Sequence, residues 1–192
     1  SVGAVGVTGT SAANLLAKAA DVVLVVGSRL QDFTTASKQI FAADVKLLHL
    51  NVSKFDGLKM DSIILQADAK SGLESLSEEL SKAGFQTSTE YRDRVAQLQS
   101  EWNAEVDRLY TLTSEEGNVQ TTIVGTLNEF MAPEDVVLCA AGSLPGDLHR
   151  LWRSEIPKTY HMEYGYSCMG YEVSGGLGAK MAMEKGEVYV II

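Results

Sequence analysis

The sequence predicts an α/β protein made of two partial, doubly wound parallel-sheet domains of the Rossmann type, joined by a long amphipathic helix. The first observation is that short, continuous apolar runs alternate with helical patterns, as they do where both faces of a parallel sheet are covered. The second is a charged segment with a single apolar stripe, which interrupts this alternation before it resumes.

The first part of the chain contains three apolar runs that predict strands. They lie at residues 21–27, 46–52 and 62–66. A helix is expected before the first strand, because Thr10 and Ser11 can cap a segment that continues to Ala20. Leu15 and Leu16 are expected on the inner face of this helix.

A second helix is expected after the third strand, with Asp68 as its N-cap and Gly84 at its end. Its leucines recur at helical spacing and are expected to face inward: Leu73, Leu76 and Leu80. Residues 1–86 are therefore predicted to form the first domain.

A long linker helix is expected next, within residues 87–117. Residues 87–90 have the pattern of a capping box. The apolar positions that follow are three or four residues apart and predict a docking face: Tyr91, Val95, Leu98, Trp102, Val106 and Leu109. The polar, turn-like residues 114–118 indicate a domain boundary.

The second domain is predicted over residues 118–192. Ile123, Leu127 and Phe130 predict a helix, and residues 136–141 form a buried strand pattern. A short strand is expected at residues 161–164. A helix rich in small residues and a last strand from Val188 complete the pattern.

Composition excludes several classes of function. A net charge of −9 argues against a nucleic-acid surface. No apolar run reaches the ~20 residues that a membrane span needs. Two cysteines, Cys139 and Cys168, fit a reducing, cytoplasmic compartment better than a disulfide scaffold. Cys139 lies in an apolar run and is expected to be an inert buried thiol.

The segment 164–180 is the most informative part of the sequence. A glycine-punctuated loop that contains Met169 precedes a helix with a small-residue face, which includes Gly170, Ser174, Gly175 and Gly178. Glycines inside a helix cost about 1 kcal/mol each relative to alanine, so close packing must compensate. From the residues alone, the segment is either a cofactor pocket or a tightly packed helix of a Rossmann-like domain.

Other candidate sites are less specific. Gly3, Gly6 and Gly9 precede the first helix and form either a phosphate cradle or a tight loop. Residues 29–32 and 142–146 follow strands, at the carboxyl ends where open α/β sheets bind ligands. Each is either a ligand-contacting loop or an ordinary solvated turn. No pair of histidines has the spacing of a zinc site.

Residues 165–179 resemble the pyrophosphate-domain loop and helix of thiamine-diphosphate enzymes of the acetohydroxyacid synthase type. In that family the segment is roughly G-L-G-T-M-G-x-G-L-P-A-A-I-G-A, and residues 166–170 take the place of L-G-T-M-G. Residues 142–145 fall where the family has G-Q-H-Q. Further upstream, the central-domain segments of the family are similar to residues 20–32, 49–52 and 66–69.

Within the family, residues 139–153 and 160–172 look like one branch. That branch uses thiamine diphosphate and Mg²⁺ to open a small cyclic polyol dione by carbon–carbon cleavage, giving a deoxyglucuronate in inositol catabolism. One alternative is a carboligase or 2-keto-acid decarboxylase with the same cofactor. The other is a non-catalytic nucleotide-binding module that uses residues 27–32, with FAD, ADP or NAD as its ligand.

The resemblance implies roles for the matching residues. Met169 would support the bent shape of the cofactor, with its N–H on a ring nitrogen, and the Ser167 carbonyl would hold the pyrimidine amino group. Gly142, Ser143 and Leu144 would approach the diphosphate. The family's Q-H-Q is replaced by Ser143-Leu144-Pro145, so its side-chain contacts to the diphosphate are not reproduced.

The resemblance also implies that the chain is a fragment of a longer enzyme. The family's metal motif, G-D-G followed by Asn, is expected just after Ile192, and no metal ligand is expected within the chain. The glutamate that activates the pyrimidine belongs to an N-terminal domain. We therefore expect the chain alone to be inactive, with no catalytic residue of its own, and the parent to be a homodimer or homotetramer.

Overall fold

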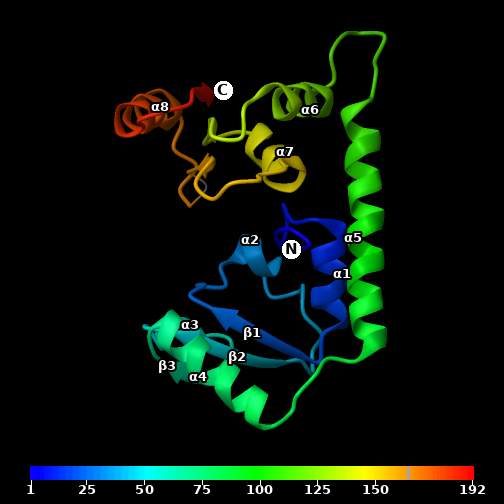
Figure 1. Ribbon diagram of the computed structural model, residues 1–192, viewed down its shortest axis with the longest axis vertical. Coiled ribbons are helices and arrows are strands. Elements are labelled where there is room, and N and C mark those ends of the chain that lie inside the picture. Colours follow the sequence, from blue (N-terminus) through cyan, green and yellow to red (C-terminus); the bar gives the residue numbers. More distant parts are fainter. Residues whose placement is uncertain (164) are drawn as a thin grey trace. The chain divides into compact units, whose positions relative to one another are not determined.

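The computed structural model describes residues 1–163 and 165–192. The chain forms two compact units, Ser1–Trp102 and Asn103–Ile192, and the boundary between them falls within one long helix. Each unit contains a three-stranded parallel sheet, and the sheet of the first unit is visible in Figure 1. The predicted α/β class with two parallel sheets is therefore confirmed. None of the helices found among the described residues has the length and apolar character required to cross a membrane.

The sheet of the first unit has the strand order β1-β2-β3. Its strands are β1 (Val22–Val26), β2 (Lys46–Asn51) and β3 (Ile63–Gln66). Both pairings are parallel, with Leu24 opposite Leu48 and Leu48 opposite Ile63. The three apolar runs therefore form strands as predicted, because short runs of β-branched and aliphatic residues favour a sheet covered by helices.

Four helices belong to this sheet: α1 (Ser11–Ala19), α2 (Asp32–Thr35), α3 (Phe55–Leu58) and α4 (Ala69–Lys82). Both predicted N-caps are present, since Thr10 accepts from Ala13 N–H and Asp68 accepts from Lys70 N–H. The helix α4 ends as predicted at Gly84, in a Schellman motif. Figure 1 shows α3 and α4 alongside β2 and β3.

The predicted inner faces of α1 and α4 are wrong in part. Leu15 is exposed on α1, whose buried residues are Ala12 and Ala13. On α4, Leu73 and Leu80 are exposed, and the buried residue is Gly72, which lies against Leu50 of β2. Small residues at these contacts let the helix approach the sheet, so its large apolar residues are displaced to other faces.

The long helix α5 (Thr89–Tyr110) begins one residue later than a capping box on Thr87 implies. Ser88 is the cap, because its hydroxyl accepts from Tyr91 N–H at 3.1 Å. Leu98 and Val106 are buried, as the predicted docking stripe requires, whereas Tyr91 at its start is exposed.

The sheet of the second unit has the order β5-β4-β6, with β4 in the middle. Its strands are β4 (Val136–Cys139), β5 (Tyr160–Met162) and β6 (Val188–Val190). All are parallel, and every residue of β4 is buried. The short strand expected at residues 161–164 is thus present, although Tyr164 lies outside the described residues.

Three helices belong to the second sheet: α6 (Gln120–Phe130), α7 (Leu144–Leu151) and α8 (Tyr171–Ala182). The helix predicted from Ile123, Leu127 and Phe130 is present as α6, and its buried residues are Val124 and Gly125. A Cβ on Gly125 would collide with the Tyr110 ring, which explains why this face of α6 is the inner one.

A helix at α7 was not expected, because the sequence indicated a loop or turn over residues 142–146. The proline in its first turn is compatible with a helix, since the first turn needs no N–H from that position. Residues 144–151 therefore pack as a helix, with Leu148 and Leu151 buried.

Candidate functional site

The candidate site lies at the carboxyl edge of the second sheet, where β4 and β5 end side by side. Residues 140–143 follow β4, and residues 163–170 follow β5. Glu163 N–H donates to the Cys139 carbonyl at 3.2 Å and extends the pairing by one step. Gly142 and Gly170 have φ values of +96° and +88°, a region that favours glycine, so both loops turn sharply at these residues.

The structure brings the predicted site residues to this one edge. Gly142 and Ser143 are exposed, and Leu144 is the first residue of α7. Ser167 and Met169 lie in the exposed loop 165–170, and Met169 is 89% exposed. The thioether is therefore at the surface, where a ligand can reach it.

A first carboxylate, that of Glu163, holds the loop before α8. Its Oε1 accepts from Tyr166 N–H at 3.0 Å and its Oε2 accepts from Cys168 N–H at 2.9 Å. These hydrogen bonds, the one from Cys168 first, hold the pKa of Glu163 below its usual range. The charged carboxylate therefore shapes residues 165–168.

A second carboxylate belongs to Glu172, a residue that is 3% exposed in the first turn of α8. Its Oε1 accepts from Ala141 N–H at 3.0 Å and its Oε2 accepts from Gly170 N–H at 2.9 Å. The hydrogen bond from Ala141 is the first cause of its lowered pKa.

Neither glutamate was predicted to be a site residue. One signal was available for Glu172, which stands where the family segment has its second glycine after the methionine. A charged residue on the small-residue helix indicates a specific partner, because a buried carboxylate must be hydrogen-bonded.

Two backbone groups of the loop remain available to a ligand. Within residues 1–163 and 165–192, neither the Met169 N–H nor the Ser167 carbonyl has a hydrogen-bond partner. Ser167 also has a φ of +51°, which is uncommon for a residue with a side chain and typical of functional loops. A donor, an acceptor and an exposed thioether fit the pyrimidine end of thiamine diphosphate.

The loop after β4 also has polar groups at its tip. Ser143 is exposed, and its hydroxyl does not cap α7. Neighbouring Cys139 is fully buried, as predicted, and burial raises the pKa of its thiol. The loop is thus suited to contact a ligand through Ser143 and its backbone rather than through the cysteine.

His161 lies on β5, two residues before Glu163. In the structure its Nε2 is 2.7 Å from the Tyr171 hydroxyl, and the two rings are stacked. This pair joins β5 to the start of α8. Among the residues that the structure describes, no group of three or more His, Cys, Asp and Glu side chains is arranged to hold a metal ion.

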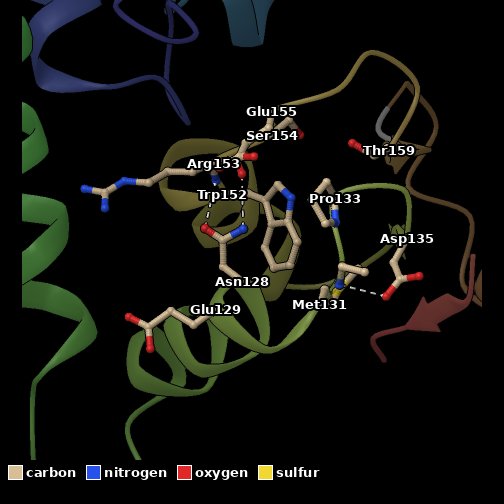
Figure 2. Close-up of a pocket in the computed structure, with 11 residues that line it drawn as sticks. Asn128, Glu129, Met131, Pro133, Asp135, Trp152, Arg153, Ser154, Glu155 and Thr159 are labelled. Carbon is tan, nitrogen blue, oxygen red and sulfur yellow. Dashed lines mark hydrogen bonds between the residues drawn. The ribbon is translucent and has the colours of Figure 1, made fainter.

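A cavity of about 310 Å³ lies elsewhere in the same unit (Figure 2). Its walls come from the segment between α6 and β4 and from the residues after α7, including Met131, Asp135 and Trp152. It therefore opens at the amino end of β4. Ligands of parallel α/β sheets bind at the opposite, carboxyl ends of the strands.

Several polar groups around this cavity already form hydrogen bonds or ion pairs within the protein. The Asn128 side-chain amide donates to the Arg153 carbonyl and accepts from the Arg153 N–H, as Figure 2 shows. Asp135 accepts from Ala132 N–H and Glu187 N–H. The Arg153 guanidinium forms an ion pair with Asp107 at 2.8 Å. We therefore place the candidate site at the other edge of the sheet.

The glycine-rich start of the chain forms a tight loop rather than an open cradle. A Cβ on Gly3 would collide with Thr10, and one on Gly6 with the Phe33 carbonyl. The Asn14 side chain bonds both Gly6 N–H and the Gly6 carbonyl. Protein atoms thus fill the space that a phosphate would need.

The loop after β1 includes the residues of the alternative nucleotide site. Arg29 and Asp32 are exposed, and Gln31 is half-buried before the short helix α2. The Ser28 carbonyl lies 2.9 Å from His49 Nε2 and accepts from the Asn51 amide. The loop is therefore tied to β2, with Arg29 at the surface.

Comparison with protein families matches both units. The thiamine pyrophosphate enzyme central domain matches residues 1–76, and the C-terminal TPP binding domain of the same enzymes matches residues 140–192. The second match includes all the predicted cofactor-contacting residues, 142–144, 167 and 169.

Curated relatives are similar over the whole chain. Proteins from Clostridium tetani, Halalkalibacterium halodurans and Bacillus cereus are 41%, 43% and 43% identical to it, and each is named 3D-(3,5/4)-trihydroxycyclohexane-1,2-dione hydrolase. The alignments include 100% of this chain and 33% of each relative, so the chain spans about one third of their length. The chain belongs to the thiamine pyrophosphate enzymes and contains parts of their central domain and of their C-terminal cofactor-binding domain.

Proposed function

We propose that this chain is part of a thiamine-diphosphate- and Mg²⁺-dependent hydrolase. The enzyme would cleave a carbon–carbon bond of trihydroxycyclohexane-1,2-dione and give 5-deoxyglucuronate. The observation that carries the proposal is the 41–43% identity to relatives of that name over the whole chain. The exposed Met169, together with its N–H and the Ser167 carbonyl, which have no hydrogen-bond partner among the residues that the structure describes, supports the cofactor part of the proposal.

The chain's own residues would bind and orient the cofactor. The Met169 N–H would donate to a ring nitrogen, the Ser167 carbonyl would accept from the amino group, and the Met169 side chain would support the bent shape. Gly142, Ser143 and Leu144 would face the diphosphate. When bound, thiamine diphosphate supplies the electron sink for breaking a bond next to a carbonyl.

The cation is the second requirement. Glu163 and Glu172 bring two negative charges to the edge of the sheet that would receive a diphosphate. Like charges repel, so Mg²⁺ on the diphosphate would favour binding there. The Mg²⁺ ligands are proposed to lie in the G-D-G…Asn motif, after Ile192.

The whole protein is proposed to be a cytoplasmic homodimer or homotetramer. We propose residues 1–86 as its central-domain part, 87–117 as the linker and 118–192 as the start of its cofactor-binding domain. The 192-residue chain alone is expected to lack turnover, because it spans about one third of the relatives' length.

Product analysis of the full-length protein tests the proposed reaction. With Mg²⁺ and thiamine diphosphate, the cyclic dione should be opened and pyruvate should be left unchanged. A carboligation or decarboxylation product from pyruvate, with no ring opening, would favour the alternative reaction class. Turnover of the dione by the 192-residue chain alone would contradict the proposed inactivity of the fragment.

A further inference from the structure

Glu172 connects two loops that lie far apart in the sequence. Its carboxylate accepts one hydrogen bond from Gly170, at the start of its own helix, and one from Ala141, 31 residues away. A glutamate that only capped α8 would bond within its own first turn. The bond to Ala141 is instead a tertiary contact between the end of β4 and the start of α8.

The two donors border the two segments proposed to hold the cofactor. Ala141 directly precedes residues 142–144, and Gly170 directly follows Met169. One buried, rigidly held side chain thus fixes the distance between the proposed diphosphate loop and the proposed pyrimidine loop. Hydrogen bonds from N–H groups to a carboxylate are among the stronger ones in proteins, which suits this function.

The carboxylates of Glu163 and Glu172 both accept hydrogen bonds from backbone N–H groups of this loop. Glu163 takes those of Tyr166 and Cys168, and Glu172 takes that of Gly170. The N–H of Met169, between the last two, is left without a partner among residues 1–163 and 165–192. The same arrangement that fixes the loop therefore leaves the proposed cofactor-binding N–H available.

We propose that Glu172 is a positioning residue of the cofactor site, which holds the loop after β4 and the loop before α8 in a binding-competent arrangement. This inference rests on the proposed function. Without the carboxylate, both loops would sample other conformations. The apparent affinity for the cofactor would then fall in proportion to the fraction of molecules that remain competent to bind it.

The test is made on the full-length protein that contains this chain, with Glu172→Gln as the variant. The amide has nearly the shape of the carboxylate, but its NH₂ group faces one N–H donor, so that hydrogen bond is lost. Glu184→Gln is the matched control, because Glu184 follows the same helix and is exposed. Circular dichroism verifies that each variant is folded.

The dissociation constant for thiamine diphosphate is measured in excess Mg²⁺ by isothermal titration calorimetry. Glu172→Gln should raise it by about tenfold or more, as expected from the loss of one charge-assisted hydrogen bond. Glu184→Gln should leave it within about twofold. Binding by Glu172→Gln within about twofold of the wild type would overturn the inference while the proposed function stood.

Hydrogen exchange in the wild-type protein tests the inference without a variant. The Ala141 and Gly170 amides should be protected before cofactor is added, and the Met169 amide should gain protection only after it is added. Fast exchange at Ala141 and Gly170, or a Met169 amide already protected without cofactor, would overturn the inference. A wild-type protein that binds no thiamine diphosphate would overturn the proposed function, and this inference with it.

Discussion

Replacing Gly72 with alanine tests the helix-to-sheet contact that organises the first unit. Gly72 is the buried residue of α4, and a Cβ built on it would lie 2.6 Å from Leu50 Cδ1 and 2.8 Å from Leu50 Cδ2. Leu50 is 2% exposed in the middle strand of the sheet, so its side chain has little room to move. We expect Gly72→Ala to destabilise the unit.

The magnitude follows from two opposing effects. Alanine in a helix interior is favoured over glycine by about 1 kcal/mol. Forcing an extra carbon into a well-packed contact costs about 1–3 kcal/mol. The net effect expected for Gly72→Ala is a loss of about 1 kcal/mol in the free energy of unfolding.

Gly178→Ala on α8 is the matched control. It has the same gain in helix propensity, but no atom lies within 4 Å of the added Cβ. We expect it to stabilise by about 0.5–1 kcal/mol. A second control, Leu50→Val, removes the two δ carbons that Gly72→Ala would meet, so in that background Gly72→Ala should be neutral or stabilising.

Urea denaturation of the 192-residue chain, followed by far-UV circular dichroism, measures these changes. Two transitions are expected if the two units unfold separately, and each variant is then judged on the transition of its own unit. The reasoning is refuted if Gly72→Ala stabilises as much as Gly178→Ala, or if Leu50→Val leaves the effect of Gly72→Ala unchanged.

Three further predictions concern the second unit. The pKa of Glu172 is lowered in the folded protein, so the charged carboxylate stabilises the fold above its ordinary pKa, and this stabilisation is lost as pH falls through the lowered value. The Glu172→Gln variant should therefore be less stable than wild type at pH 7. The difference between their urea midpoints should shrink as the pH is lowered. A thiol reagent should label exposed Cys168 in the native chain and buried Cys139 only after unfolding, as mass spectrometry of the labelled peptides can determine. Tyr110→Phe should lower the free energy of unfolding by about 1 kcal/mol in urea melts, because the Tyr110 hydroxyl donates to the Leu151 carbonyl at 2.6 Å. Burial also raises the pKa of Tyr110 to about 12, so its absorbance should titrate at higher pH than that of exposed tyrosines.

The sequence was a reliable guide to strands and helix ends. Residues 21–27, 46–52, 62–66 and 136–141 are apolar runs, and each contains a strand of the structure. Capping residues were equally informative, as at Thr10 and Asp68, because a side-chain oxygen near the helix start satisfies N–H groups that have no partner in the helix.

Helix faces were predicted less well, for a physical reason. Hydrophobic periodicity detects large side chains, whereas the buried residues of α1 are Ala12 and Ala13 and α4 lies against Leu50 of β2 through Gly72. The gain at such contacts comes from the partner's side chain filling the space above a glycine. The position of that partner is absent from the local sequence pattern.

The sequence predicted which segments contain the candidate site, but not the hydrogen bonds that hold those segments in place. Ser143, Ser167 and Met169 were identified through family resemblance, and the structure places them at one sheet edge. Glu163 and Glu172 were missed, because their function depends on hydrogen bonds that follow from the meeting of two loops.

The amino-acid sequence by itself determined the α/β class, the strands, the helices α1, α4, α5, α6 and α8, and the segments that belong to the cofactor domain, because these depend on local periodicity, caps and motifs. Tertiary structure alone decided which helix faces are buried and which backbone N–H groups are already bonded. Both depend on residues that are distant in the chain and become neighbours only when parallel strands pair and helices pack on them.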